Sequence, residues 1–342
     1  MKRLIVSLLT VVCALSVSAQ QYFFTVDERH PAARPLLSKA RNILVVNNTT
    51  PQPMDFGHSN YEDGTLLEGS SVDLGNAVLR CLFATTQTMD DSGEFERVEL
   101  MDISQNRSQN FYVRTPMTVA DEEKLCSEYE ADALLILNHL VLYDVCESYP
   151  IEDEQYYAYL QVCSQSHWTV HHLGSVRDVV FTTADTLYWE SAFSYTRAQV
   201  LSDLPDRQQA LTYMAQQVGE DVATSLTPQW EPATHYLYDH PDVTIQRGMR
   251  AFQRKQWATA IDIWQAALES DDKKVRTTAA ADMAIAAEMQ GDYSSACDYA
   301  RLAADLFGAW KNADGRQQQI NMRHYLEHLR VREEEEVALS AY

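Results

Sequence analysis

The stretch Ala131-Asp132-Ala133-Leu134-Leu135-Ile136-Leu137-Asn138 decides the first half of the fold. It places apolar residues in an unbroken row and ends in a polar side chain. A short run of this kind is typical of a strand that is buried on both faces. We expect the strand to start here and to continue through residues 141–143. A helix should precede it, beginning at Thr118, which is a hydroxyl N-cap, and ending near Glu130.

The segments before this helix alternate between strand and helix patterns. Residues 42–47 are a second short apolar run, and residues 97–103 alternate apolar with charged side chains, so both are predicted strands. Residues 48–71 are rich in Asn, Thr, Pro, Asp, Gly and Ser and are predicted to be a long loop. A helix is predicted over residues 72–88 by the helical spacing of Leu74, Val78, Leu82 and Phe83.

The segments after the strand are mostly extended. Residues 147–154 are predicted to be an acidic turn, and residues 156–172 a long strand. One or two further strands are expected over residues 176–195. A helix over residues 206–226 then closes the unit. Alternating elements followed by antiparallel strands predict an α+β fold, an α/β sandwich with a mixed sheet.

The composition changes after a connector at residues 231–243. Residues 244–336 are almost free of strand patterns and contain an internal repeat, in which Trp257 and Tyr293 stand 36 residues apart. The positions that carry the repeat are small or aromatic: Gly248, Trp257, Ala260, Trp264, Ala267, Gly291, Tyr293, Ala296 and Ala303.

This repeat resembles the tetratricopeptide repeat, whose period is about 34 residues. The resemblance implies two antiparallel helix pairs over residues 244–309, in which small residues let the helices approach closely. A capping helix and an acidic tail are expected over residues 310–342. The expected fold class is therefore α+β followed by an all-α tetratricopeptide-like helical hairpin domain.

The first domain, residues 20–230, resembles the N-terminal α/β domain of TolB-like and CsgG-like periplasmic proteins. The likeness rests on residues 131–136 after a short helix, the strands at 43–46 and 167–170, and the closing helix before Pro228. Because the repeats follow this domain in the chain, the whole sequence is similar to an uncharacterised Bacteroidetes family of exported proteins. That family is classed as a domain of unknown function. That resemblance implies a compartment and an architecture, and it implies no activity.

Residues 1–19 have the pattern of an export signal. A basic start is followed by an apolar stretch too short to span a bilayer, and small residues lead to an expected cleavage after Ala19. We expect an exported protein of the periplasm or of the periplasmic face of the outer membrane. The rival interpretation is a lipid anchor on Cys13, which Val12 disfavours because a lipoprotein signal has a small residue there. No second stretch reaches transmembrane length.

The charge balance excludes several classes of partner. The 342 residues include 27 Lys plus Arg and 49 Asp plus Glu, a net charge of −22. Most of this acidity lies in residues 20–240, whose net charge is −21, whereas residues 241–342 carry −3. Nucleic acid and anionic lipid surfaces both require clustered cations, so we expect neither as a partner.

Cysteine usage leaves the disulfide question open. Five cysteines follow the signal: Cys81, Cys126, Cys146, Cys163 and Cys297. An odd number in an oxidising compartment leaves at least one thiol unpaired within the chain. Cys146 and Cys163 flank the acidic turn and could pair across a hairpin, or the thiols could be free and buried as small apolar groups.

Catalytic and metal-binding signatures are missing from the sequence. There is no Gly-x-Ser-x-Gly, no His-Glu-x-x-His and no phosphate-binding loop. His167, His171 and His172 are the best metal candidates, but two histidines four residues apart on a strand lie about 13 Å apart, too far for one ion. We therefore expect no cofactor, no metal and no enzymatic activity.

Our first hypothesis is a non-catalytic adaptor or scaffold of the cell envelope that binds a protein or peptide through the repeats. The groove would be lined by inward positions of the first helix of each pair: Ile245, Met249, Phe252, Gln253, Ala281, Ile285, Glu288 and Met289. The alternative is that the α/β domain is a ligand-binding or enzymatic module and the repeats serve assembly. A deep pocket near the ends of the early strands would favour that alternative. Homo-oligomerisation through a sheet edge is a third hypothesis.

Overall fold

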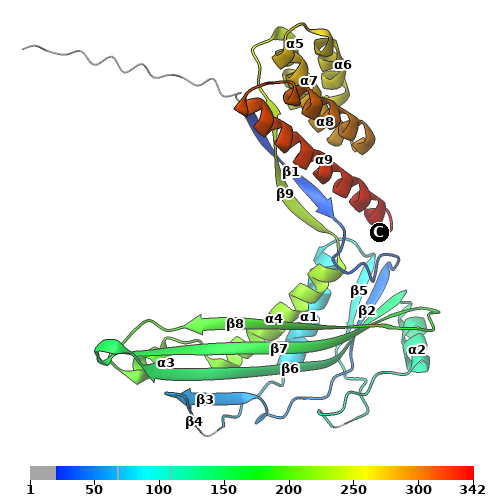
Figure 1. Ribbon diagram of the computed structural model, residues 1–342. Helices are drawn as coiled ribbons and strands as arrows, with labels where there is room; N and C mark the ends of the chain where they lie inside the picture. Colours follow the sequence, from blue (N-terminus) through cyan, green and yellow to red (C-terminus); the bar gives the residue numbers. More distant parts are fainter. Residues whose placement is uncertain (1–20, 68, 109) are drawn as a thin grey trace, which may run out of the picture. The chain divides into compact units, whose positions relative to one another are not determined.

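A computed structural model describes residues 21–67, 69–108 and 110–342 (Figure 1). The expected export signal and Cys13 lie outside these ranges. The described residues form two compact units. An α/β unit contains residues 29–229 and 338–342, and a helical unit contains residues 21–28 and 230–337.

The α/β unit is built on one mixed sheet. Its strands are β2 (Asn42–Asn47), β3 (His58–Glu62), β4 (Thr65–Leu66), β5 (Arg97–Met101), β6 (Ala133–Pro150), β7 (Tyr156–His172) and β8 (Val179–Glu190). The first part of β6 pairs with β2 in parallel, and β2 pairs in parallel with β5. Further along, β6 pairs in parallel with β3, which pairs with β4. On its other edge β6 pairs antiparallel with β7, which pairs antiparallel with β8.

Helices cover both faces of this sheet where it is most apolar. They are α1 (Ala77–Asp91), α2 (Val119–Tyr129), α3 (Arg197–Ser202) and α4 (Arg207–Leu226). The main core lies between the sheet and the pair α1 and α4, with Leu135, Trp168 and Met214 among its buried members. A smaller core lies on the other face, where Leu125 of α2 packs near Leu134. The predicted cap of α2 is confirmed, because Thr118 Oγ1 accepts a hydrogen bond from the Asp121 backbone N–H at 3.2 Å.

A register shift in β6 keeps the apolar side chains of both its halves facing the main core. It lies between Leu137 and His139 in the pairing with β7. Leu135 and Leu137 point into the main core before the shift, and Leu140 and Leu142 do so after it. An extra residue in a strand reverses the alternation of faces, so the bulge lets both halves of β6 contribute to one core.

Several segment boundaries differ from those expected. Residues 48–71, predicted to be a loop, contain β3 and β4. The predicted acidic turn is shorter, because β6 continues to Pro150 and only Glu152–Glu154 forms a 3-10 turn. Hydrogen bonding to the neighbouring strand explains both differences, since it stabilises polar segments that carry no apolar strand pattern.

The helical unit consists of packed helix pairs and a two-stranded ribbon. Its elements are β1 (Gln21–His30), β9 (Gln229–Tyr238), α5 (Val243–Gln253), α6 (Trp257–Gln265), the 3-10 helix Ala266–Glu269, α7 (Lys273–Glu288), α8 (Tyr293–Gly308) and α9 (Ala313–Leu339). Strand β1 pairs with β9, most of which lies in the segment that we treated as a connector. The expected fold class, α+β followed by an all-helical region of packed helix pairs, is confirmed.

Small residues bring the paired helices together, as the repeat pattern predicts. Most of the pattern positions are buried: Gly248, Ala260, Trp264, Ala267, Ala296 and Ala303. Trp257 and Tyr293 are half-buried, and Gly291 is exposed with φ +73°. The indole N–H of Trp264 donates to the Ile245 carbonyl at 3.1 Å, which places its ring against Gly248.

The five described cysteines are free thiols. Cys146 lies opposite Leu160 in the β6–β7 ladder, whereas Cys163 lies opposite Tyr143. The suggested disulfide across the hairpin is therefore wrong, because the register separates the two residues by three ladder positions. Burial raises the pKa of Cys81 to about 12, as expected for a thiol that serves as a small apolar group.

The described helices do not combine the length and the apolar content that crossing a lipid bilayer requires.

We predict that Gly248→Ala destabilises the helical unit. A Cβ at this position would lie 2.1 Å from Trp264 Nε1, and Trp264 is fully buried and held by its hydrogen bond. We expect a loss of about 1–3 kcal/mol in the free energy of unfolding, the usual cost of overpacking. The same change at an ordinary helical position is stabilising by about 1 kcal/mol.

Urea denaturation measures this change, with the exposed neighbour Arg247→Ala as a control that should stay within about 0.5 kcal/mol of wild type. A Gly248→Ala protein as stable as wild type would contradict the close approach of α5 and α6.

Candidate functional site

The groove residues expected in the repeats are not exposed as a groove. Met289 is half-buried and Gln253 is exposed, while the other positions are buried: Ile245, Met249, Phe252, Ala281, Ile285 and Glu288. The interpretation of these six residues as an open partner surface is wrong. Their burial has a clear cause, because the β1–β9 ribbon packs on them. The ring of Phe24 lies 5.2 Å from that of Phe252, and Tyr238 packs in one cluster with Ala281.

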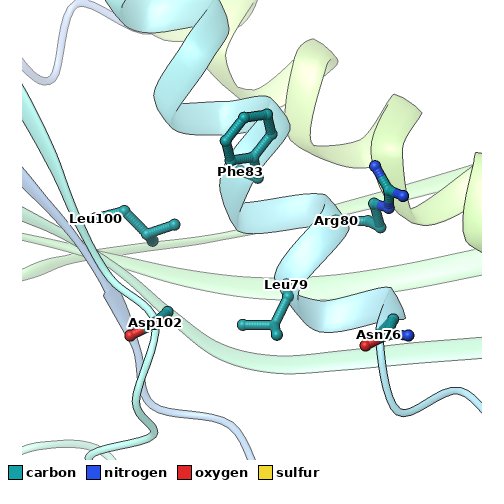
Figure 2. A pocket seen from close by; sticks show the side chains of 6 residues that line it. All are labelled: Asn76, Leu79, Arg80, Phe83, Leu100 and Asp102. Atoms are coloured by element: carbon teal, nitrogen blue, oxygen red, sulfur yellow. The ribbon is translucent and has the colours of Figure 1, made fainter.

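An open groove lies instead between α1 and β5 in the α/β unit (Figure 2). It has a volume of about 450 Å³. Leu79 and Phe83 extend from α1 toward Leu100 of β5, and Arg80 points away from them (Figure 2). Leu79 is 39% exposed and Phe83 is 57% exposed. Phe83 stays exposed because β5 is the last strand on this side of the sheet among the described residues.

Strand β5 offers a free backbone edge beside this groove. It pairs with β2 from Arg97 to Met101, and no other strand among the described residues pairs with it. On the outer edge of such a strand, alternate residues present N–H and C=O groups that can pair with another extended chain. The combination of a free edge and an adjacent apolar groove is suited to holding an extended peptide.

A second cavity continues from the groove and shares Leu79 and Asp102 with it. It has a volume of about 400 Å³ and lies at the carboxyl end of β2 near the start of α1. Its polar lining residues are Asn47, Thr49, Gln52, Asp73, Asp102 and Ser104. Asn47 Nδ2 donates to the Asp102 carbonyl at 2.8 Å, and Thr49 Oγ1 donates to Asn47 Oδ1 at 2.9 Å. These bonds order one wall of the cavity, at the place where open α/β sheets commonly bind ligands.

Two clusters of carboxylates and imidazoles have the composition of metal sites. One contains Glu28, Glu288 and His328 in the helical unit, and the other contains Glu122, His171 and Asp178 in the α/β unit. Glu28 is far in sequence from Glu288 and His328, and Glu122 is far from His171 and Asp178, so no spacing motif signals either cluster. Only Glu288 and His171 were singled out from the sequence, the first for a groove and the second beside His167.

The cluster in the helical unit lies among imidazole, guanidinium and phenol groups. His235 Nε2 lies 2.8 Å from Glu28 Oε1, and His328 Nε2 lies 3.4 Å from Glu288 Oε1. Arg332 Nε approaches Glu28 Oε2 at 3.5 Å, and the Tyr325 hydroxyl donates to Glu288. The nearby carboxylates of Glu28 and then Glu288 outweigh burial and raise the pKa of His328 to about 9. Burial favours protonation of Glu28, but its bonds to the two histidines prevail and lower its pKa.

The cluster in the α/β unit has three carboxylates around a single imidazole. Glu122 is 1% exposed and His171 is fully buried, and two further carboxylates, of Glu123 and Asp178, lie beside the imidazole. Burial, and then the negative charge of Asp178, raise the pKa of Glu122 to about 7. The site therefore favours a bound cation, a proton included, over bare carboxylates.

We predict that the helical unit loses stability above neutral pH through His328. A group whose pKa is raised by folding stabilises fully below its unfolded pKa, about 6.5 for histidine, and loses that contribution as pH rises through its folded pKa. Glu28 and Glu288 face His328, with His235, Tyr325 and Arg332 around them. The Tm difference between wild type and His328→Gln should therefore be largest near pH 6 and shrink toward pH 10, as measured by calorimetry.

The comparison of the two proteins removes pH effects that they share. A Tm difference that is constant from pH 6 to pH 10 would show that the imidazolium does not stabilise the network.

Two protein families match the chain, one in its N-terminal part and one in its C-terminal part. Residues 40–238 match the family described as Domain of unknown function (DUF8603), and residues 246–331 match Domain of unknown function (DUF6340). No curated protein matches the chain. The first match covers more than half of the 342 residues. The chain therefore belongs to the DUF8603 family of unknown function and carries a DUF6340 domain behind it.

Proposed function

We propose that the protein is a non-catalytic adaptor that holds an extended segment of a partner protein along β5. The segment would add to the sheet as a strand, and alternate side chains would enter the groove lined by Leu79, Phe83 and Leu100. The observation that carries this proposal is the free edge of β5 beside that groove. Strand addition combines backbone hydrogen bonds, which give affinity, with side-chain pockets, which give specificity.

The exposed apolar side chains of the groove favour binding. Burying a Phe or Leu side chain that is now partly in water is worth about 1.5–3 kcal/mol when burial is complete. Strand β8 is also at an edge of the sheet, with Val179 and Val180 exposed, whereas β5 lies beside the groove lined by Leu79, Phe83 and Leu100. We therefore assign the binding role to β5.

Charge indicates the chemistry of the partner segment. Residues 29–229 contain 12 Lys plus Arg and 29 Asp plus Glu, a net charge of −17. Asp73 and Asp102 line the cavity that continues from the groove. A segment with apolar residues at alternate positions and a Lys or Arg next to them would fit both the apolar groove and these two carboxylates. The negative electrostatic field of the α/β unit would also speed the association of such a segment.

The cell envelope is the compartment that we propose for this adaptor. Support comes from the signal-like residues 1–19 and from the likeness of the first domain to TolB-like and CsgG-like domains of exported proteins. The tetratricopeptide-like helix pairs would then act as a scaffold. The β1–β9 ribbon covers the groove that we assigned to them, so partner binding moves to the α/β unit. Homo-oligomerisation through a sheet edge would compete with peptide for β5.

We predict that a peptide library displayed on phage selects sequences with apolar residues at alternate positions and at least one basic residue. A selected peptide, measured by fluorescence anisotropy, should bind Phe83→Asp at least about 30-fold more weakly, the equivalent of about 2 kcal/mol of lost burial. Methylating the peptide backbone at alternate residues should abolish binding, since it removes the N–H groups that pair with β5.

Phe193→Asp is the matched control, because Phe193 is 65% exposed in the same unit and lies outside the groove. Equal affinity of the selected peptide for wild type and Phe83→Asp would exclude the groove. Unchanged affinity after backbone methylation would exclude strand addition.

A second candidate function is small-ligand binding in the 400 Å³ cavity. Its ordered polar wall at the carboxyl end of β2 favours this function. A panel of small cationic and polyhydroxy compounds, screened by thermal shift, should then give a hit whose effect is lost in Asp102→Asn and kept in Phe83→Asp. A screen without such a hit would leave the peptide as the better supported ligand.

A further inference from the structure

Three side chains from separate elements of the α/β unit meet at a buried point. Glu122 lies in the first turn of α2, His171 lies near the end of β7, and Asp178 lies just before β8. His171 Nδ1 is 2.8 Å from Asp178 Oδ1 and 3.4 Å from Glu122 Oε2. The possible ligand atoms of the three residues all lie within 4.8 Å of one another. The group therefore offers one nitrogen and two oxygen ligands around a single point.

Two polar atoms of this group have no hydrogen-bond partner although they are buried. They are Glu122 Oε2 and His171 Nε2. The Glu122 side chain is 2% exposed, and that of His171 is 0% exposed. A buried carboxylate oxygen without a partner costs free energy unless another group or ion satisfies it. Glu122 Oε2 faces the imidazole and Asp178, so the missing partner would lie between them.

Among the described residues, no Lys or Arg forms an ion pair with Glu122, Glu123 or Asp178. Lys124, in the same helix turn, forms its ion pair with Glu128 at 3.5 Å. Glu123 adds a further carboxylate, with Oε1 3.3 Å from His171 Nε2. In the helical unit, by contrast, Arg332 and two histidines face two glutamates. The α/β cluster is thus an acidic, buried group that a divalent cation would neutralise.

We propose that Glu122, His171 and Asp178 bind a divalent first-row metal ion, with Zn²⁺ bound more tightly than Mn²⁺. The ligand separations of 2.8 and 3.4 Å bracket the about 3.0–3.3 Å expected between neighbouring ligands at metal bonds of about 2.1 Å. Imidazole favours Zn²⁺ over Ca²⁺ and Mg²⁺, and affinity for a common ligand set rises from Mn²⁺ to Zn²⁺.

Glu123 would orient His171 and would not itself bind the ion. Its carboxylate faces His171 Nε2 on the side away from Asp178, where it can hold the ring with Nδ1 directed to the ion. The side chains of Asp178 and Glu123 are 23% and 35% exposed, so a hydrated ion can reach the site from solvent. Water would complete the coordination on that side.

The bound ion would tie the start of α2 to the end of the β7–β8 connection. The backbone N–H of Gly174 in that connection already donates to Glu123 Oε1 at 2.8 Å. Metal binding would therefore stabilise the α/β unit against unfolding, since the ligands come together only in the folded chain.

Titration of the EDTA-treated, desalted full-length protein with ZnCl₂ and with MnCl₂ tests the proposal. Calorimetry should give one high-affinity equivalent of Zn²⁺, weaker Mn²⁺ binding, and still weaker Ca²⁺ binding. Glu122→Gln and Asp178→Asn should each weaken Zn²⁺ at least 100-fold, and Glu123→Gln about 10-fold. Saturating Zn²⁺ should raise the Tm of wild type and leave that of Glu122→Gln unchanged.

The variants also control for folding. Glu122→Gln removes a buried carboxylate that lacks a cation, so its metal-free Tm should equal or exceed that of wild type. Asp178 is in a connection and partly exposed, so Asp178→Asn tests the site independently. Glu288→Gln, which alters the buried cluster of the helical unit, should bind Zn²⁺ as wild type does. Three results would each overturn the proposal. They are an unchanged Zn²⁺ affinity in Glu122→Gln, an absence of saturable Zn²⁺ binding up to 1 mM (about 4 kcal/mol), and tighter binding of Ca²⁺ than of Zn²⁺.

Discussion

The pairing of β6 on both of its edges is the interaction on which the α/β unit depends. One edge pairs first with β2 and then with β3, while the other edge pairs with β7 along nearly its whole length. Residues 134–137 are fully buried. A strand that is paired on both edges and apolar on both faces must be covered by other elements on each side. That requirement brings α1 and α4 to one face and α2 to the other.

The peptide groove and the proposed metal site both lie at the edges of the helix layers that cover the sheet. The groove occurs where α1 lies against β5, the last strand on this side of the described sheet, and Leu79 and Phe83 stay exposed there. The metal ligands occur where the first turn of α2 meets the end of β7. Core packing next to each margin is tight, with Leu82 and Leu134 fully buried, so Phe83 and Glu122 extend from well-packed helices.

The repeat residues show how a correct local pattern can lead to a wrong surface. The small and aromatic positions do bring helix pairs together, as with Gly248 beneath Trp264. The inward positions of the first helices were expected to face a partner. They face β1 and β9 instead, with Phe24 packed on Phe252 and Tyr238 N–H donating to the buried Asp282. An amphipathic helix pattern identifies an apolar face and does not say which chain covers it.

Local sequence patterns were enough to predict most of the strands and helices. The apolar run after Asp132, the hydroxyl cap at Thr118 and the long extended segment before His172 predicted a strand, a helix start and a strand that the structure contains. These features depend on near neighbours in the chain, through side-chain alternation, capping and helical spacing. Tertiary structure alone decided that β5 is an edge, that Phe83 is exposed and that Glu122, His171 and Asp178 meet. Those outcomes depend on which segments pair across the sheet, and strand pairing joins residues too far apart in sequence for any local pattern to encode.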